Sequence, residues 1–547
     1  MMRKKLTYFL PVLLISGFLI WEYKINILIW SLPKLASITM PVSENIPTSW
    51  TKGPEIPSGD DRPNIILVLA DDMGYNDISA HNGGAADGTL QTKNIDALAK
   101  SGMLFSRGYA ANATCAPSRA SIMTGKYPTR FGYEFTPVPA TGRLIMQWLA
   151  EEDDPVLRQR IDNKVASKLP PYFEQGMPTE QKTIAEVLSD AGYYTAHIGK
   201  WHLGHANGMD PQSQGFKDSL QMVGPLYLPE DHPEVVNAKN DDRIDQMVWG
   251  LGQYSAKFND SNYFAPDKYL TDYYTDEALK VIENNKNRPF FLYLSHWAIH
   301  NPLQALRSDV EQMQHMQGHN LQVYAGMIEA LDRSIGKIVQ KLKDLDIYGK
   351  TLIIFTSDNG GANYIELEDI NKPYRGWKIS FFEGGIRVPY IVSWPDEIKP
   401  NQTSNSAVHH FDIFPTIASA AGVEFSETLD GKNLLPFIKN ENLSDPHKTL
   451  FWSSGNHQSV LHENWKYIIS KKENFRWLFD TSVDPLEKNN LIETYPNVTK
   501  QIEELLVQFN SEQKEPLFPS SYEIGVMIDK HNGLQYEEED EYIFWSN

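Results

Sequence analysis

The chain has 547 residues and a formal net charge of −20, with 41% apolar and 22% charged residues. This composition is typical of a folded globular protein and excludes a largely disordered chain. The acidic balance argues against a nucleic-acid-binding protein, because a phosphate backbone requires clustered Lys and Arg and no long basic stretch occurs. The length favours a large catalytic domain with a smaller second unit.

The beginning of the chain predicts export. A positively charged start, MMRKK, precedes an apolar run at residues 6–21, as in an export signal. A second apolar stretch at residues 25–32 follows without a small-residue cleavage site, so the segment is either cleaved or kept as a membrane anchor. Residues 41–63 contain Pro, Ser and Thr and are expected to form a linker. We therefore assign residues 1–60 to a signal or anchor plus linker, and we expect a periplasmic or extracellular protein with a possible membrane tether.

The central part of the chain predicts an α/β fold. Continuously apolar, β-rich runs indicate strands that are buried on both faces, as in a parallel sheet. These runs span residues 64–70, 289–295, 351–356 and 388–393. Amphipathic helical patterns, such as residues 183–191 and 323–345, lie between them. Residues 61–443 should therefore form a large, mixed, mostly parallel sheet sandwiched by helices.

The pattern changes near residue 444. Short alternating segments such as residues 465–470 and 476–480 predict a small antiparallel sheet, so residues 444–547 are expected to form a C-terminal α+β subdomain. The acidic run at residues 537–541 is expected to be a solvated tail rather than a site.

Oxygen-bearing side chains follow two of the predicted strands. Asp71 and Asp72 come after the first strand, and Asp358 and Asn359 follow the strand at residues 351–356. Because open α/β sheets bind ligands beyond the carboxyl ends of their strands, these side chains are candidates for one site. Carboxylate and amide oxygens suit Ca²⁺ or Mg²⁺. The alternative interpretation is that both segments are ordinary turns, in which Asp, Asn and Gly are common.

Cys115 is the only cysteine, so the chain can form no intrachain disulfide. An ordinary buried thiol is one interpretation of such a residue. Its context is more specific, because Cys115 begins the segment CAPSRASIMTG, in which Pro117 and Ser118 are suited to the start of a helix. The amino end of a helix favours anions.

This segment resembles the signature of the type I, formylglycine-dependent sulfatases of the alkaline-phosphatase-like superfamily, CxPSR followed by a TG pair. Six further segments are similar to the same family and occur in its order, and the resemblance extends from about residue 62 to the DPLEKNNL segment that ends at Leu491. The segments are LADDMG from Leu69, GKWHLG from Gly199, IHNPL with His300, TSDNGG from Thr356, RGWK from Arg375 and EGGIRVP from Glu383.

The resemblance implies hydrolysis of sulfate esters, of a sulfated carbohydrate or an aryl sulfate. A maturation enzyme would convert Cys115 to formylglycine, and a metal, usually Ca²⁺ and less often Mg²⁺, would bind an oxygen of that residue. The implied protein ligands of the metal are Asp71, Asp72, Asp358 and Asn359. The residues implied to surround the sulfate are Arg119, Lys200, His202, His300 and Lys378.

The implied mechanism starts from the hydrated aldehyde, one hydroxyl of which attacks sulfur in line. Arg119 and Lys200, with Lys378, would stabilise the negative charge. His300, assisted by Lys378, is the candidate acid for the leaving oxygen. His202 would take the proton of the second hydroxyl, so that sulfate leaves and the aldehyde returns.

Two insertions separate these motifs, at residues 137–180 and 224–274. They are candidate walls of a substrate pocket, because loops on a rigid scaffold commonly set specificity. The second insertion contains several aromatic residues, some of which suit stacking on sugar rings and at least half of which are expected to be packing residues. They are Tyr227, Trp249, Tyr254, Tyr263, Tyr269 and Tyr273.

Three other functions compete with the sulfatase hypothesis. A phosphonate or phosphodiester hydrolase of the same superfamily would recognise a similar tetrahedral anion, although GKWHLG and RGWK favour sulfate. A catalytically silent carbohydrate-binding relative would not require the complete set of motif residues. A cysteine–histidine hydrolase would have no use for the carboxylates.

Overall fold

A computed structural model describes residue 31 and residues 40–150, 154–440 and 444–547. The expected export signal therefore lies almost wholly outside the described residues. Within them, no helix combines the length and the apolar character that crossing a bilayer requires. The expected linker packs on the fold along α10 (Leu270–Asn285), because Trp50 is buried and its Nε1 donates to Glu277 at 2.6 Å.

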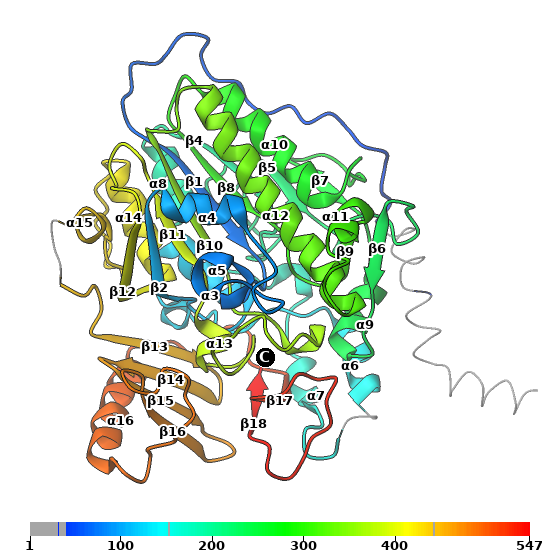
Figure 1. The fold of residues 1–547 in the computed structure, drawn as a ribbon, viewed down its shortest axis with the longest axis vertical. Helices are drawn as coiled ribbons and strands as arrows, with labels where there is room; N and C mark the ends of the chain where they lie inside the picture. The colour runs from blue at the N-terminus through cyan, green and yellow to red at the C-terminus, as the bar shows by residue number, and fades with distance from the viewer. Residues whose placement is uncertain (1–30, 32–39, 151–153, 441–443) are drawn as a thin grey trace, which may run out of the picture.

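A large sheet forms the centre of the molecule (Figure 1), with the strand order β12-β2-β11-β10-β1-β8-β4-β5-β7. The core strands β10, β1, β8, β4 and β5 are parallel to one another, and β12 is parallel to β2. The bounds are β1 Asn64–Ala70, β2 Met103–Tyr109, β4 Tyr194–Gly199, β5 Asp218–Met222, β7 Ala256–Phe258, β8 Phe290–Ser295, β10 Thr351–Ser357, β11 Tyr390–Ser393 and β12 Gln402–His409.

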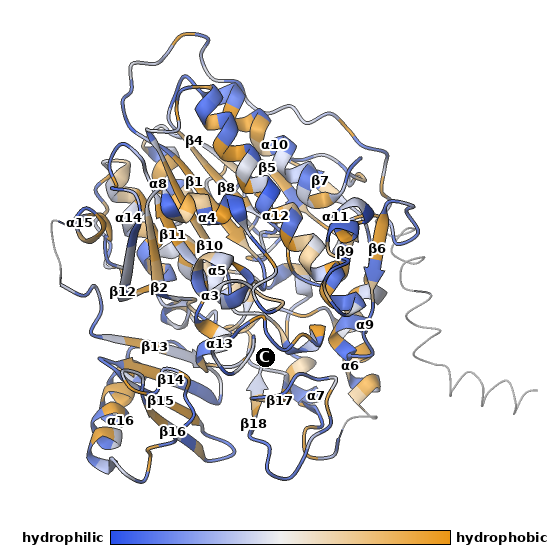
Figure 2. Cartoon of the chain, viewed as in Figure 1, coloured by the Kyte–Doolittle hydropathy of each residue, from blue (hydrophilic) through white to orange (hydrophobic). Residues whose placement is uncertain are grey.

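Helices cover both faces of this sheet, so the predicted sandwich is confirmed. Ile66 and Val68 of β1 join one apolar cluster, whereas Ile65 and Leu67 join the other, as the alternation of side chains along a strand requires. In Figure 2 the strands are mostly hydrophobic. The first cluster includes α4 (Lys93–Lys100), α10 and α12 (His319–Asp344), and the second includes α5 (Cys115–Thr124), α8 (Ile184–Asp190), α14 (Ile413–Ala420) and α15 (Leu435–Ile438).

The run at residues 388–393 differs from the prediction in its direction. It forms β11, which is antiparallel to both β10 and β2. A parallel return needs a crossover of a dozen or more residues, usually a helix. Between β10 and β11 the chain instead forms loops and the short α13 (Glu383–Ile386), and therefore it re-enters the sheet from the same edge.

The predicted C-terminal antiparallel sheet is present. Strands β13 to β16 form a meander, and α16 (Pro496–Ser511) packs beside it. A second small sheet, in the order β18-β17-β3, includes a strand from the first insertion, with Ile161 opposite Tyr522. The bounds are β3 Arg160–Ile161, β13 Thr449–Ser454, β14 His457–His462, β15 Trp465–Ser470, β16 Phe475–Asp480, β17 Tyr522–Met527 and β18 Tyr542–Ser546.

The two insertions pack on each other. Helix α6 (Ala140–Leu149) of the first contacts α9 (Arg243–Gly250) of the second, and Gly142 allows the close approach because an added Cβ would lie 2.9 Å from Sδ of Met247. Of the six aromatic residues noted in the second insertion, Tyr254 and Tyr263 are partly exposed and the other four are buried. The remaining elements are α3 Ser79–Asn82, α7 Asn163–Ala166, β6 Val235–Ala238, β9 Leu303–Leu306 and α11 Arg307–Gln312.

Candidate active site

The paired aspartates meet the SDN segment at the carboxyl edge of the sheet. Strands β1 and β10 are parallel neighbours with Ala70 opposite Ser357, so the residues that follow them emerge together. The backbone N–H of Asp72 donates to Oδ1 of Asp358 at 3.2 Å. Asp71, Asp72 and Asp358 are all buried. Burial and then the Asp358 carboxylate raise the pKa of Asp71 to about 6.

Cys115 lies at the first position of α5 and faces these aspartates. Its Sγ is 3.6 Å from Oδ1 of Asp71 and 3.9 Å from Oδ1 of Asp72. The thiol is buried, with 3% of the residue exposed. Burial, reinforced by the Asp358 carboxylate, raises the pKa of the Cys115 thiol well above its usual value. An unmodified Cys115 is therefore a neutral thiol and a weak nucleophile.

Three cations surround the three carboxylates. Arg119, one helical turn after Cys115, donates from Nη2 to Asp71 at 2.6 Å and to Asp358 at 2.8 Å. Lys200 directly follows β4, and its Nζ is 2.8 Å from Oδ2 of Asp71. Nζ of Lys378 is 2.7 Å from Oδ1 of Asp72. Such pairing compensates for burying charged groups, which is costly for an isolated ion.

Both predicted histidines belong to this cluster. Nε2 of His300 is 3.5 Å from Oδ2 of Asp72, and its ring stacks on Trp297 with 3.9 Å between centroids. His202 has a buried Nδ1 without a hydrogen-bond partner among the described residues. Burial, together with the charges of nearby lysines, lowers the pKa of both imidazoles well below the usual value. The structure thus brings all ten predicted residues together.

Two residues of the site were missed from the sequence. The hydroxyl of Tyr364 donates to Oδ2 of Asp72 at 2.8 Å and accepts from Nζ of Lys378 at 3.1 Å. Trp297 lies between the cation of Lys200, 4.6 Å from its ring centroid, and the ring of His300. No motif marks Tyr364. Trp297 could have been suspected, because it follows β8 as His300 does.

The carboxylate and amide oxygens of this site fit a hard divalent cation. Oxygen, sulfur and nitrogen atoms of Asp71, Asp72, Cys115 and His300 lie within 4.8 Å of one another. Oδ1 of Asn359 is buried and has no hydrogen-bond partner among the described residues, which leaves it available as a ligand. Its Nδ2 donates to Asp72 at 2.8 Å, so the amide is oriented. Asp358 lies outside the group of four and is held by Arg119.

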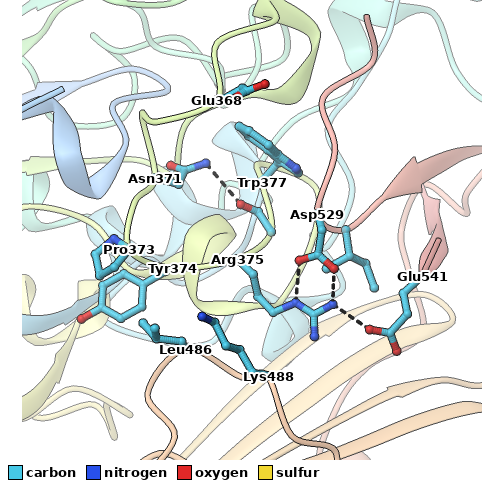
Figure 3. Close-up of a pocket in the computed structure, with 12 residues that line it drawn as sticks. Glu368, Asn371, Pro373, Tyr374, Arg375, Trp377, Leu486, Lys488, Asp529 and Glu541 are labelled. Carbon is cyan, nitrogen blue, oxygen red and sulfur yellow. Dashed lines mark hydrogen bonds and ion pairs between the residues drawn. The ribbon is translucent and has the colours of Figure 1, made fainter. Parts of the chain in front are cut away.

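The loop that carries Lys378 is attached to the end of the chain. Figure 3 shows Arg375 between Asp529 and Glu541, to which its guanidinium donates at 2.8 and 2.7 Å. Lys488 and other residues line a cavity of about 470 Å³ around this contact. Glu541 belongs to the acidic run at residues 537–541, whose side chains are mostly exposed, and its own carboxylate, 44% exposed, pairs with Arg375.

Comparisons with known proteins decide the family. A protein-family model described as Sulfatase matches residues 63–423, most of the chain. The chain belongs to the sulfatase family. A second model, N-sulphoglucosamine sulphohydrolase, C-terminal, matches residues 376–514.

Named relatives agree with this assignment. The sulfatase is 32% identical to the N-acetylgalactosamine-6-sulfatase of Sus scrofa, over 72% of this chain and 69% of the relative. It is 28% identical to the steryl-sulfatase of Homo sapiens, over 89% and 90% of the two chains. The crystal structure of Ps i-CgsB in complex with k-i-k-neocarrahexaose superposes with a TM-score of 0.68 at 30% identity and covers 83% of this chain and 94% of that one. The protein is therefore an enzyme that hydrolyses sulfate esters, and the predicted fold class is confirmed.

Proposed function

We propose that this sulfatase removes sulfate from carbohydrates with a formylglycine derived from Cys115 and a bound Ca²⁺. The observation that carries the proposal is the position of Cys115, whose Sγ lies within 4 Å of a carboxylate oxygen of both Asp71 and Asp72. A thiol kept neutral by burial has little use as a nucleophile there, whereas an oxygen nucleophile beside a cation site suits sulfate ester hydrolysis.

Ca²⁺ is favoured over Mg²⁺ by the character of the donors. Asp71, Asp72, Asp358 and Asn359 would hold the cation through side-chain oxygens, and all four are buried. Mg²⁺ usually keeps several waters and binds through one or two carboxylates, whereas Ca²⁺ accepts many protein oxygens in a flexible arrangement. Oδ1 of Asn359, which is buried and accepts no hydrogen bond from the described residues, adds one more protein oxygen that can bind Ca²⁺.

When present, the hydrated aldehyde supplies the nucleophilic hydroxyl and the cation supplies positive charge beside it. The protein's own cations then stabilise the sulfuryl oxygens. Lys200 and Lys378 reach the site from loops that follow β4 and β10, and each is 5 to 7% exposed, so their charges act with little solvent screening. Arg119 holds Asp71 and Asp358 in place.

Proton transfer is assigned to the two histidines. His300 Nδ1 lies 2.6 Å from the carbonyl oxygen of Asn301, which fixes Nδ1–H as the donor and leaves Nε2 directed at the site. Nε2 bears no proton in this neutral tautomer and is 3.4 Å from Nζ of Lys378, so the Lys378 ammonium is the source of the proton that His300 would pass to the leaving oxygen. His202, with its unpartnered Nδ1, is the candidate base for the second hydroxyl.

A carbohydrate substrate is supported by the relatives. N-acetylgalactosamine-6-sulfatase is named for a sulfated sugar, and Ps i-CgsB was crystallised with k-i-k-neocarrahexaose. We further propose an exported enzyme with a catalytic domain at residues 61–443 and a C-terminal subdomain at 444–547, tethered or released through residues 1–60. Modification of Cys115 by a maturation enzyme is part of this proposal.

The test is a comparison of esters. Sulfate release is measured from N-acetylgalactosamine 6-sulfate, from k-i-k-neocarrahexaose and from an aryl sulfate, beside phosphate and phosphonate esters of matched alcohols. We expect turnover of a sulfated saccharide and slower turnover of the phosphorus esters. Preferred hydrolysis of a phosphodiester or phosphonate would instead support the alternative superfamily function, and binding without turnover would support a silent carbohydrate-binding protein.

A further inference from the structure

The segment that follows β8 carries two residues of the active site, and the second insertion holds this segment in place. Nε1 of Trp297 donates to the carbonyl oxygen of Pro225 at 2.8 Å. The hydroxyl of Tyr227 lies 2.9 Å from the carbonyl oxygens of both Trp297 and His300, and Tyr227 is fully buried. Pro225 and Tyr227 belong to the second insertion, which the sequence indicates only as a candidate wall of the substrate pocket.

A buried carboxylate of the same insertion holds the residue that follows His300. Asp245 lies in the first turn of α9, and its Oδ1 accepts from Nδ2 of Asn301 at 3.0 Å. Its Oδ2 accepts from the backbone N–H of Asn240 at 2.9 Å. Both contacts come from N–H groups, so the carboxyl acts as an acceptor at each oxygen, as an ionised carboxylate does. Asp245 and Asn301 are each 1% exposed, and a buried hydrogen bond to a carboxylate is stronger than one between neutral groups.

Asn301 in turn orients the imidazole of His300. Nδ1–H of His300 donates to the carbonyl oxygen of Asn301 at 2.6 Å. This contact directs Nε2 into the site, where it lies 3.5 Å from Oδ2 of Asp72 and 3.4 Å from Nζ of Lys378. The plane of the ring is fixed by its stacking on Trp297. A displacement of Asn301 would therefore turn the imidazole within its stack and move Nε2 away from the path of the proton, and small misplacements of this kind are costly to catalysis.

We propose that Asp245 is a positioning residue for proton transfer to the leaving oxygen, and that it acts on His300 through Asn301. The inference rests on the proposed role of His300 and extends it to a residue that no motif marks. The second insertion then serves the chemical step, because it holds both the hydrogen-bond partner and the stacking partner of this histidine. The loss caused by removing Asp245 should grow with the basicity of the leaving oxygen, since the more basic leaving groups depend most on protonation.

The test compares two aryl sulfates of similar size in the mature enzyme. 4-Nitrophenyl sulfate releases a stable phenolate that needs little protonation, whereas 4-methoxyphenyl sulfate releases a more basic one. In Asp245→Ala, kcat for the methoxyphenyl ester should fall about tenfold or more, and kcat for the nitrophenyl ester should fall less than about threefold. KM should change little for either ester, because the lysines proposed to bind the sulfate do not depend on Asp245.

A second measurement needs no substrate. In enzyme labelled with nitrogen-15 histidine, the Nδ1–H proton of His300 should give a downfield, exchange-protected signal, because its hydrogen bond is short and buried. The signal is assigned by its absence in His300→Ala, and Asp245→Ala should shift or broaden it. Asp245→Asn keeps an amide oxygen that can accept from Asn301, so this milder variant should fold and should show a smaller change of the same kind in both measurements.

Asp218→Ala is the matched control. Oδ1 of Asp218 accepts from Nδ2 of Asn259 at 3.0 Å, and Asp218 is 4% exposed, so the variant loses an equivalent buried Asp–Asn hydrogen bond. Asp218 is the first residue of β5, which is parallel to β4, and it therefore lies at the edge of the sheet opposite the active site. This variant should leave the ratio of the two kcat values and the His300 signal unchanged.

Two results would overturn the proposal. One is a ratio of kcat values in Asp245→Ala equal to that of the unsubstituted enzyme. The other is an unchanged His300 signal in Asp245→Ala, which would count against the proposal even if the enzyme cleaved neither aryl ester. Failure of the proposed role of His300 gives a different result, since His300→Ala would then lower both kcat values equally.

Discussion

The Sγ atom of Cys115 lies 3.6 Å from Oδ1 of Asp71, although 44 positions separate the two residues in the chain. Strand β1 carries Asp71 to the carboxyl edge of the sheet, and α5 begins at the same edge with Cys115 at its first position. Residues that the sequence presents as separate motifs thus form one buried site. The predictions below depend on this arrangement.

Removal of the metal should abolish turnover without unfolding the protein. Arg119, Lys200 and Lys378 already neutralise the three carboxylates, so the fold does not require the cation. Treatment with a chelator should leave the circular dichroism spectrum unchanged, and Ca²⁺ should restore sulfate release. At a hundredfold excess over Kd, Ca²⁺ should add about 2.7 kcal/mol to the free energy of unfolding.

Asn359→Ala should weaken this stabilisation, because the variant loses the free Oδ1. Thermal denaturation with increasing Ca²⁺ measures the effect in the absence of substrate. A melting temperature that rises equally in the variant and the unsubstituted enzyme would show that Asn359 is not a ligand.

Tyr364→Phe should lower Ca²⁺ affinity by about 10- to 100-fold, since partners that orient a metal ligand commonly contribute this much. The substitution removes the hydroxyl that donates to Asp72 and accepts from Lys378. Calcium titration by calorimetry is the measurement. The matched control is Tyr194→Phe, which removes a buried Tyr–Asp hydrogen bond of 2.7 Å to Asp218 at the amino end of β4. If both variants bind Ca²⁺ equally well, Tyr364 has no positioning role.

Lys466→Met should destabilise the protein by about 3–5 kcal/mol, because it leaves the buried carboxylate of Glu487 without a cation, whereas Glu383 keeps its ion pair with Arg387. Nζ of Lys466 lies 2.7 Å from Glu383 and 2.9 Å from Glu487, and the lysine side chain is fully buried. Urea unfolding measures the loss. Lys472→Met is the control, since its ion pair with Glu523 is half-exposed and should contribute less than about 1 kcal/mol. Equal losses of unfolding free energy in Lys466→Met and Lys472→Met would show that the buried ion pairs of Lys466 stabilise the protein no more than an exposed pair does.

Glu134 should make stability depend on pH. Burial raises the pKa of Glu134 to about 7, compared with an ordinary value of 4.5. The folded state therefore binds its proton more tightly than the unfolded state, so the contribution of Glu134 is complete below pH 4.5 and is lost as the pH rises through 7. Relative to Glu134→Gln, the unsubstituted protein should lose about 3 kcal/mol of unfolding free energy over this range. A difference between the two proteins that is constant with pH would contradict the assignment.

The parts that the sequence predicts are those with a strong local signal. Strands such as β1 are continuously apolar, and the motif residues occur at fixed positions after them. His296 and His300 both follow β8, yet His296 binds Ser334 of α12 at 3.0 Å, and only His300 faces the aspartates. The two-residue β3 and the hydroxyl of Tyr364 also escaped prediction, because tertiary contacts alone place them.

The most direct test relates turnover to the chemical state of residue 115. Preparations that differ in maturation are analysed by peptide mass spectrometry for the fraction of chains with formylglycine at position 115, and sulfate release is measured on the same samples. We predict a straight line through the origin, with no turnover in Cys115→Ala although that variant folds. Full sulfate release from chains that retain an unmodified Cys115 would contradict the account.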